Sequence, residues 1–317
     1  MRQQAPVEDW DVTTGTPGRP ALRVEAHPGR TFAFDWLRAQ PAPAIALDGC
    51  VRGPSRWSPD GPYASMNHHE GVDRGSTRAT CEQAVLMVAQ GLWETMRRDG
   101  APSADVHVND CDADVCTSIW VLGHPDRLHE PAVQDLINLE GILDATGGCW
   151  APPWVDCDML AQLAWAFEPY QQRRDAGDPM DAATMRAVIE EVDERLTALV
   201  DGRGERRPAW GDFELVERRG PAAAIIEHGP YARIAARRAG IGTLVAERRS
   251  GERRVVTLAK TSPFVVTDLI AAYARLNEIE GCSDDDRWGG SDLVGGSPRC
   301  GGTRLPLALV LDVVAGC

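Results

Sequence analysis

A repeated order of short strand, polar loop and helix constrains the fold of this chain more than any other feature. The apolar run Ala44–Leu47 ends at Asp48, and residues 77–96 have the spacing of a helix that ends near Gly100. Residues 105–108 then predict a buried strand, which a polar loop and an apolar helical segment follow. Alternation of this kind indicates an α/β fold, with a mostly parallel sheet that is flanked by helices.

A break in the pattern at residues 201–209 divides the chain. Before it, residues 181–200 repeat apolar side chains at intervals of three and four, as an amphipathic helix does. The break itself, DGRGERRPA, combines glycine, proline and charge. We therefore predict an α/β domain at residues 41–203 and a smaller α+β domain at residues 204–317, preceded by an irregular arm at residues 1–40 that covers an edge of the first domain. The smaller domain should contain strands at residues 213–217, 223–227, 242–247 and 255–258 and a helix at residues 267–279.

The charge of the chain limits the partners that it can bind. Its 317 residues include 33 basic and 47 acidic side chains, which give a net charge of −14. Such a balance repels a long polyanion, so we expect a small anionic substrate rather than duplex nucleic acid. No segment reaches the roughly 18 apolar residues of a membrane span, and the first residues lack the apolar core of a secretory signal. We expect a cytoplasmic protein with no membrane partner, and a homodimer is compatible with this composition.

The strongest chemical signal is the loop at residues 109–114 (NDCDAD), which directly follows the strand predicted at residues 105–108. Alternate residues of an extended loop point the same way, so the carboxylates of Asp110, Asp112 and Asp114 could converge on one hard cation. The cation would offset their mutual repulsion. The same residues also suit a solvated turn or the N-cap of the following helix, because aspartate favours both.

A second signal is the pair His68 and His69, which lies after the apolar residues 62–66 and before the helix that starts near Thr77. Imidazole suits Mn, Fe or Zn better than Mg. Two surface histidines in a loop are the alternative. The pair stands at a strand-to-helix junction, as the aspartates do, and open α/β sheets place ligands at the carboxyl ends of their strands. We therefore expect the histidines and the aspartates to meet.

A glycine-rich stretch at residues 288–304 is the third signal. Glycines let backbone N–H groups approach an oxyanion closely, and arginine offers a planar fork to phosphate oxygens. The stretch is not a Walker loop, because it contains no GKS or GKT. A flexible surface loop is the alternative. We expect this stretch to supply the substrate contacts Gly295, Gly296, Ser297, Arg299 and Arg304.

These residues resemble the motifs of the DHH phosphoesterase family, which includes exopolyphosphatases, manganese pyrophosphatases and RecJ-type nucleases. Residues 67–69 (NHH) resemble its Asp-His-His motif, and residues 110–118 (DCDADVCTS) resemble its His-x-Asp-x-Asp motif. Asp48 resembles the lone aspartate that bridges the metal ions, and Asp144 resembles the later aspartate motif. Residues 67 and 110 depart from the family pattern, and the first two motifs stand in the opposite order, as a circular permutation would place them.

The resemblance implies a metal-dependent hydrolase that cleaves a phosphoester or phosphoanhydride bond in a small anionic substrate, such as a nucleotide, an oligonucleotide or polyphosphate. Two divalent ions, Mn²⁺ first and Mg²⁺ or Zn²⁺ as alternatives, would activate a water molecule. His68 would be a general acid or a substrate contact, Asp114 would belong to the catalytic centre, and the arginines of the glycine-rich stretch would neutralise developing charge. We expect the site in the cleft between the domains. The implied metal ligands are Asp48, His69, Asp110, Asp112, Asp114 and Asp144.

Two other functions fit the same residues. One is a hydrolase of amides or esters with a single metal ion, in which the aspartate triplet is largely structural. The number of ions per chain separates it from the two-ion hydrolase. The other is a ligand-binding or regulatory module that has lost catalysis, for which the departures at Asn67 and Asp110 argue. Tight ligand binding without turnover would identify that module.

Overall fold

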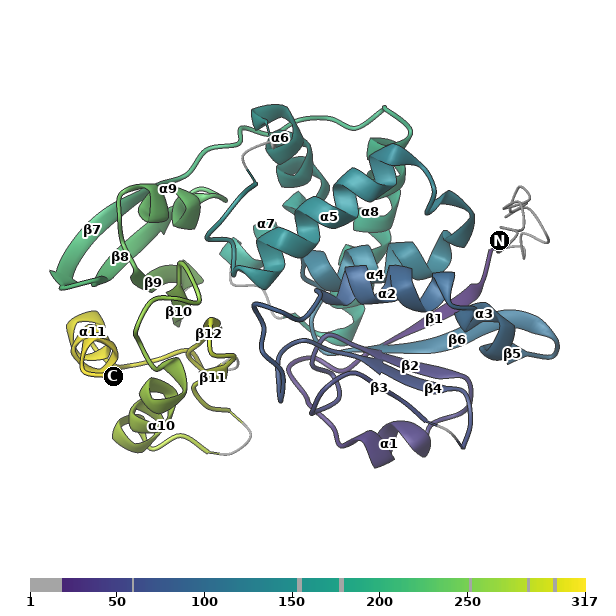
Figure 1. Ribbon diagram of the computed structural model, residues 1–317, viewed down its shortest axis with the longest axis horizontal. Helices are drawn as coiled ribbons and strands as arrows, with labels where there is room; N and C mark the ends of the chain where they lie inside the picture. Colours follow the sequence, from purple (N-terminus) through teal and green to yellow (C-terminus); the bar gives the residue numbers. More distant parts are fainter. Residues whose placement is uncertain are drawn as a thin grey trace, which may run out of the picture.

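Two β-sheets, each with its own helices, organise the chain (Figure 1). The computed structural model describes residues 19–58, 60–152, 156–176, 180–250, 253–283, 286–298 and 301–317. Among these, the strands of the first sheet end at Val108 and those of the second begin at Asp212. The break at residues 201–209 lies between the two sheets.

The first sheet is mixed, with a parallel centre. Four neighbouring strands run parallel, and two short strands pair antiparallel with them. The prediction of a mostly parallel sheet is therefore correct for this centre only. The parallel strands are, in spatial order, β1 (Ala21–Ala26), β6 (Ala101–Val108), β2 (Ala44–Leu47) and β4 (Tyr63–Met66), while β3 (Arg56–Trp57) pairs with β4 and β5 (Arg97–Arg98) pairs with β6.

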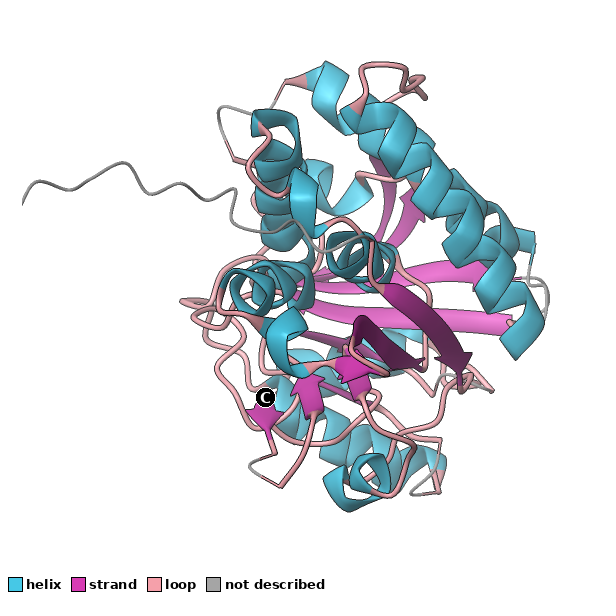
Figure 2. Cartoon of the chain, turned by 90° about the vertical axis from the view of Figure 1, so that its right-hand side faces the viewer, coloured by secondary structure: helices cyan, strands magenta, loops and turns pink. Residues whose placement is uncertain are grey.

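Helices pack on both faces of the first sheet, and Figure 2 shows the strands between helical layers. Side chains alternate along a strand, so Val106 and Val108 pack into the larger layer whereas Ala44 and Ala46 face the short helix α1 (Phe34–Arg38). No helix in the described part of the chain is both long and apolar enough to cross a membrane. The helices of the larger layer are α2 (Thr80–Ala89), α3 (Leu92–Thr95), α4 (Ala113–Gly123), α5 (Pro131–Ala145), α6 (Cys157–Ala166), α7 (Glu168–Ala176) and α8 (Ala182–Val200).

The second sheet is mostly antiparallel. Among its described strands only β8 and β9 run parallel, and α9 (Ala232–Arg238) lies in the connection between them. One face packs against α10 (Leu269–Glu280) and α11 (Leu307–Ala315), and the other packs against α9 and Cys149 of the first half. The spatial order is β11 (Gly289–Gly290), β12 (Val294–Gly296), β10 (Arg253–Lys260), β9 (Thr243–Ser250), β8 (Ala222–His228) and β7 (Asp212–Arg219).

The structure confirms the strongly periodic elements and corrects two others. The helix predicted at residues 77–96 is divided into α2 and α3, because Gly91 adopts φ = +89° between them. The arm predicted as irregular at residues 1–40 contains β1 and α1, while residues 1–18 lie outside the described part. β1 becomes a strand by pairing with β6, with Ala21 opposite Ser103. That partner lies far along the chain, so local pattern alone does not reveal the pairing.

Candidate functional site

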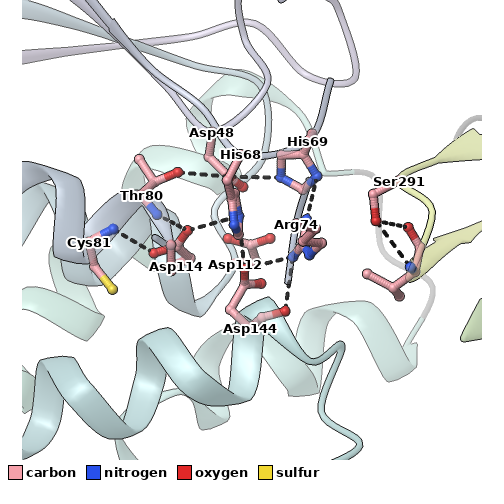
Figure 3. Close-up of polar contacts among 12 residues, drawn as sticks. Asp48, His68, His69, Arg74, Thr80, Cys81, Asp112, Asp114, Asp144 and Ser291 are labelled. Atoms are coloured by element: carbon pink, nitrogen blue, oxygen red, sulfur yellow. Dashed lines mark hydrogen bonds and ion pairs between the residues drawn. The ribbon is translucent and has the colours of Figure 1, made fainter. Parts of the chain in front are cut away.

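The carboxyl ends of two neighbouring parallel strands bring the first site residues together. Asp48 directly follows β2, and His68 and His69 follow β4 after one intervening residue. Asp48 Oδ1 lies 2.7 Å from His69 Nε2 and 3.3 Å from His68 Nε2. The same Oδ1 accepts a hydrogen bond from the Thr80 hydroxyl at 3.0 Å. The predicted meeting of these strand ends is confirmed (Figure 3).

Two helices add carboxylates to His68. Asp114 lies in the first turn of α4 and Asp144 in the last turn of α5, and their Oδ2 atoms lie 3.4 and 2.9 Å from His68 Nε2. His68 is completely buried, and neither of its ring nitrogens has a partner with hydrogen-bond geometry. One buried nitrogen therefore faces the oxygens of three carboxylates without forming a regular hydrogen bond to any of them.

Electrostatics favour a positive charge at the position that these carboxylates share. Burial alone would lower the pKa of His68, but Asp144 and Asp48 outweigh burial and raise that pKa to about 10. Burial would likewise raise the pKa of Asp48, yet its contacts with His69 and His68 hold that pKa well below the usual range. The folded chain thus creates a site in which carboxylates require a cationic partner.

Asp114 is fixed by the start of another helix. Its Oδ2 accepts the backbone N–H of Thr80 at 2.8 Å and its Oδ1 accepts that of Cys81 at 2.7 Å, so the carboxylate lies at the N-terminus of α2. Both oxygens occupy the positive end of the α2 dipole. Burial, followed by the negative charges of Asp144 and Asp48, nevertheless raises the pKa of Asp114 to about 7.

The other two aspartates of the triplet do not converge on the same nitrogen. Asp112 is the N-cap of α4, where it accepts the Val115 N–H at 3.1 Å, and Asp110 accepts the N–H of the next residue at 2.8 Å. Neither belongs to the groups whose ligand atoms lie within 4.8 Å of one another. The expectation of three converging carboxylates stays a prediction. The chain turns into a helix at Ala113, which ends the alternation of an extended loop, and Figure 3 shows Asp112 beside Asp114, Arg74 and Asp144. Burial, and then the charges of neighbouring aspartates, hold the pKa of Asp112 well above its usual range.

Arg74 is a site residue that the sequence analysis missed. Its Nη1 donates to His69 Nδ1 at 2.9 Å, and its Nη2 donates to Asp144 Oδ2 at 2.7 Å and to the Asp144 carbonyl oxygen at 2.9 Å. The residue is 2% exposed. Burial would raise the pKa of Asp144, but Arg74 and His68 outweigh burial and lower it. The position of Arg74 in a loop after the histidine pair was the only sequence signal.

Asn67 points away from the carboxylates. Its Nδ2 donates to the carbonyl oxygens of Val51 at 3.2 Å and Gly53 at 2.8 Å, and its Oδ1 accepts the His69 N–H at 2.9 Å. The residue is buried, and its backbone carbonyl accepts hydrogen bonds from Ser55 and Gln83. Asn67 therefore positions the histidine pair through the backbone.

At the residues expected to contact a substrate, the glycine-rich stretch does not form an open loop. It forms part of the second sheet. A Cβ on Gly295 would lie 2.3 Å from the Gly289 carbonyl oxygen, and one on Gly296 would lie 2.7 Å from that of Val256, so close strand packing requires both glycines. Ser297 is buried and its hydroxyl accepts the Val256 N–H at 3.1 Å. Substrate contacts by these three residues stay a prediction.

Only one of the two expected arginines lies in the described part of the chain. Arg304 is exposed, and its backbone N–H donates to Glu280 at 2.7 Å, whereas Arg299 lies outside the described residues. Another part of the stretch does approach the site. A Cβ on Gly147 would lie 2.8 Å from the Val294 side chain, and one on Gly75 would lie 3.6 Å from that of Leu293. Figure 3 places Ser291 of the same segment on the Arg74 side of the cluster.

The cluster is open on one side. The side chains of His69 and Asp144 are 27% and 20% exposed, whereas those of Asp48, His68 and Asp114 are almost completely buried. A ligand would therefore meet His69 and Asp144 first. His68 cannot touch a substrate directly in this arrangement, which argues against the substrate contact expected for it.

Comparison of the chain with protein-family models, with curated proteins and with solved structures gives no match. The resemblance to the DHH phosphoesterases consequently stays a prediction that rests on the motifs quoted above. What the structure adds is the convergence of a histidine and three aspartates from two strand ends and two helices.

Proposed function

We propose that this chain is a metal-dependent hydrolase that cleaves a phosphoester or phosphoanhydride bond of a small anionic substrate. The observation that carries the proposal is the Nε2 atom of His68, which is buried, forms no hydrogen bond of regular geometry and faces carboxylate oxygens of Asp48, Asp114 and Asp144. Buried polar atoms without partners are rare, and a bound ion is one of their ordinary explanations.

The set of donor atoms suits a divalent transition metal. Carboxylates favour Mg²⁺, Ca²⁺ and Mn²⁺, whereas imidazole favours Zn²⁺, Fe²⁺ and similar ions, so a mixed set suits Mn²⁺, Fe²⁺ or Zn²⁺ better than Mg²⁺. The residues that would hold the ion are His68, Asp48, Asp114 and Asp144. When bound, such an ion lowers the pKa of a coordinated water and polarises a phosphoryl oxygen.

The chain's own residues would divide the remaining tasks. The two histidines exchange the roles that the sequence suggested: buried His68 fits the ligand, and the more exposed His69 fits the substrate contact. Arg74 is buried, and it supplies a fixed positive charge that orients His69 and Asp144. The hydrogen bonds to Thr80 and Cys81 keep Asp114 in place, so the site requires little rearrangement when it binds an ion.

Replacement of His68 tests this proposal. Purified wild-type protein is titrated with Mn²⁺ by calorimetry and assayed with bis(4-nitrophenyl) phosphate and with pyrophosphate. We expect His68→Gln to lose at least about 100-fold in Mn²⁺ affinity together with hydrolysis, because it removes a ligand and not merely a supporting group. The matched control is His107→Gln, which changes another buried histidine whose ring bonds His27 instead. Circular dichroism verifies that both variants fold.

The outcomes separate the three functions. Loss of ion and hydrolysis in His68→Gln, with both retained in His107→Gln, supports the proposal. Mn²⁺ binding by the wild-type protein without hydrolysis of either substrate would contradict it and favour the regulatory module. Hydrolysis of amide or ester substrates alone would favour the other enzyme class. A wild-type protein that binds no Mn²⁺ would refute the metal site itself.

A further inference from the structure

We propose that Arg74 makes this cluster a single-ion site, because its guanidinium already engages Asp144 Oδ2 and His69 Nδ1, the two residues on the open side that a second cation would need. The inference rests on the proposed function and specifies the number of ions in the same site. It replaces the two-ion expectation drawn from the sequence motifs, so the substrate and not the number of ions separates this hydrolase from an amide or ester hydrolase.

Arg74 holds both residues on the open side of the cluster. Nη2 donates to Asp144 Oδ2 at 2.7 Å and Nη1 donates to His69 Nδ1 at 2.9 Å, while a third hydrogen bond to the Asp144 carbonyl fixes the guanidinium. A guanidinium that is 2% exposed is stable only while such partners surround it. The contacts therefore belong to the fold and are not those of a mobile surface side chain.

The hydrogen bond to His69 decides where the ring proton lies. Arginine donates hydrogen bonds and accepts none, so His69 Nδ1 must be the acceptor and carries no proton. The proton of the neutral ring is then on Nε2, which donates it to Asp48 Oδ1 at 2.7 Å. A nitrogen that carries a proton has no lone pair for a metal. His69 can bind an ion through Nε2 only if its proton moves and Arg74 withdraws.

The remaining ligands suffice for one ion. The two groups of closely spaced ligand atoms, Asp48 with His68 and His69, and His68 with Asp114 and Asp144, share His68. Only its Nε2 faces the carboxylates, and one imidazole nitrogen binds one ion. With His69 engaged as a hydrogen-bond donor, the ligands left in these two groups are His68 and the three aspartates Asp48, Asp114 and Asp144.

Charge leads to the same conclusion. A second divalent ion bound to Asp144 would lie next to the guanidinium that already occupies Asp144 Oδ2, and like charges repel strongly where little water separates them. Arg74 instead provides the second positive charge permanently. The site then has the ion on one side of Asp144 and Arg74 on the other.

Ion stoichiometry tests the inference. Wild-type protein, Arg74→Met, Arg74→Lys and Arg195→Met are each titrated with Mn²⁺, and bound metal is counted by elemental analysis after dialysis. Methionine has a similar length but neither charge nor donor. Arg195→Met is the matched control. It also removes a paired arginine, but Arg195 pairs with Glu168, which is not a residue of the cluster. We expect one ion in the wild-type, Arg74→Lys and Arg195→Met proteins, and a second ion in Arg74→Met.

The results distinguish this inference from the proposed function. Two ions in the wild-type protein, or one ion in a folded Arg74→Met, would overturn the inference and leave the metal site intact. No ion in the wild-type protein would overturn the proposed function first.

A second measurement needs no variant at position 74. The ¹⁵N spectrum of the His69 ring in wild-type protein reports which nitrogen carries the proton, before and after addition of diamagnetic Zn²⁺. We expect Nε2–H in both spectra, because Arg74 keeps Nδ1 as an acceptor. Loss of the Nε2 proton on addition of Zn²⁺ would show that His69 binds the ion and would overturn the inference.

Discussion

The side chain of Asn67 joins the loop before it and the histidine pair after it in one hydrogen-bond network. It donates to two carbonyl oxygens, those of Val51 and Gly53, and accepts from the N–H of His69. An aspartate in its place has no proton to donate when ionised. The departure from the Asp-His-His pattern thus has a local reason, which is unrelated to loss of a metal ligand.

Asn67→Asp should therefore destabilise the protein. The carboxylate would face two carbonyl oxygens inside the fold, and the unsatisfied charge should lower the free energy of unfolding by about 3 kcal/mol. Urea unfolding measures the change. Asn138→Asp, at an exposed position of α5, is the control and should change the same free energy by less than about 0.5 kcal/mol. Equal stability of Asn67→Asp and the wild-type protein would show that the network is unimportant.

Some residues of the site can be predicted from the local sequence, and others cannot. Asp48 and His68 each follow an apolar strand. Their positions at the carboxyl ends of these strands therefore predict that the two side chains lie close together. Asp112 and Asp114 share the same local signal, but only the actual start of α4 decides which of them faces His68. Arg74 lies in an irregular loop, and its importance depends on Asp144, a contact between residues far apart in the chain. No local pattern encodes such a contact.

Among the elements, the second face of the first sheet carries a histidine pair, of which His107 is buried and His27 is partly exposed. His107 of β6 points to the face opposite the helices that contain Asp114 and Asp144, and its Nδ1 lies 3.0 Å from His27 Nε2 just after β1. Trp36 of α1 packs edge-on against both rings. The pair therefore links two strand ends to α1.

This pair predicts a dependence of stability on pH. Burial, and then His27, lower the pKa of His107 to about 4, whereas an unfolded histidine titrates near 6.5. Below about pH 6.5 the unfolded chain binds a proton that the folded chain does not, so the free energy of unfolding should fall by up to about 3 kcal/mol as the pH decreases toward 4. Urea unfolding at about pH 7 and about pH 4.5 measures the loss, which His107→Gln should reduce. An equal loss in both proteins would contradict the assignment.

Among the elements, periodicity predicted those that bury one continuous face. β2, β6, α8 and the strands β7 to β10 were found because their apolar spacing is regular over several residues. β1, α1 and the short strands β11 and β12 were missed, since each contains few residues and depends on a partner elsewhere in the chain. The order of strands in the first sheet places β6 between β1 and β2, which only tertiary pairing decides.

At the scale of the whole molecule, the second sheet closes against the first half beside the cluster. Val294 packs on Gly147, just after Asp144, and Arg233 donates to the Gly147 carbonyl at 2.8 Å while it pairs with the buried Glu227. The sequence predicted a contribution of the glycine-rich stretch to the site. In the described residues, its segment around Leu293 and Val294 is the part that reaches Gly75 and Gly147, which lie close in sequence to Arg74 and Asp144.

The central claim, that His68 and the aspartates around it bind a divalent metal, is tested most directly by locating the ion. Crystals of wild-type protein grown with Mn²⁺ would be measured on both sides of the manganese absorption edge. We expect one anomalous peak per chain within coordination distance of His68 Nε2, with Arg74 still bonded to Asp144. Two peaks would contradict the role of Arg74, and no peak beside His68 under conditions in which the protein is folded would contradict the metal site itself.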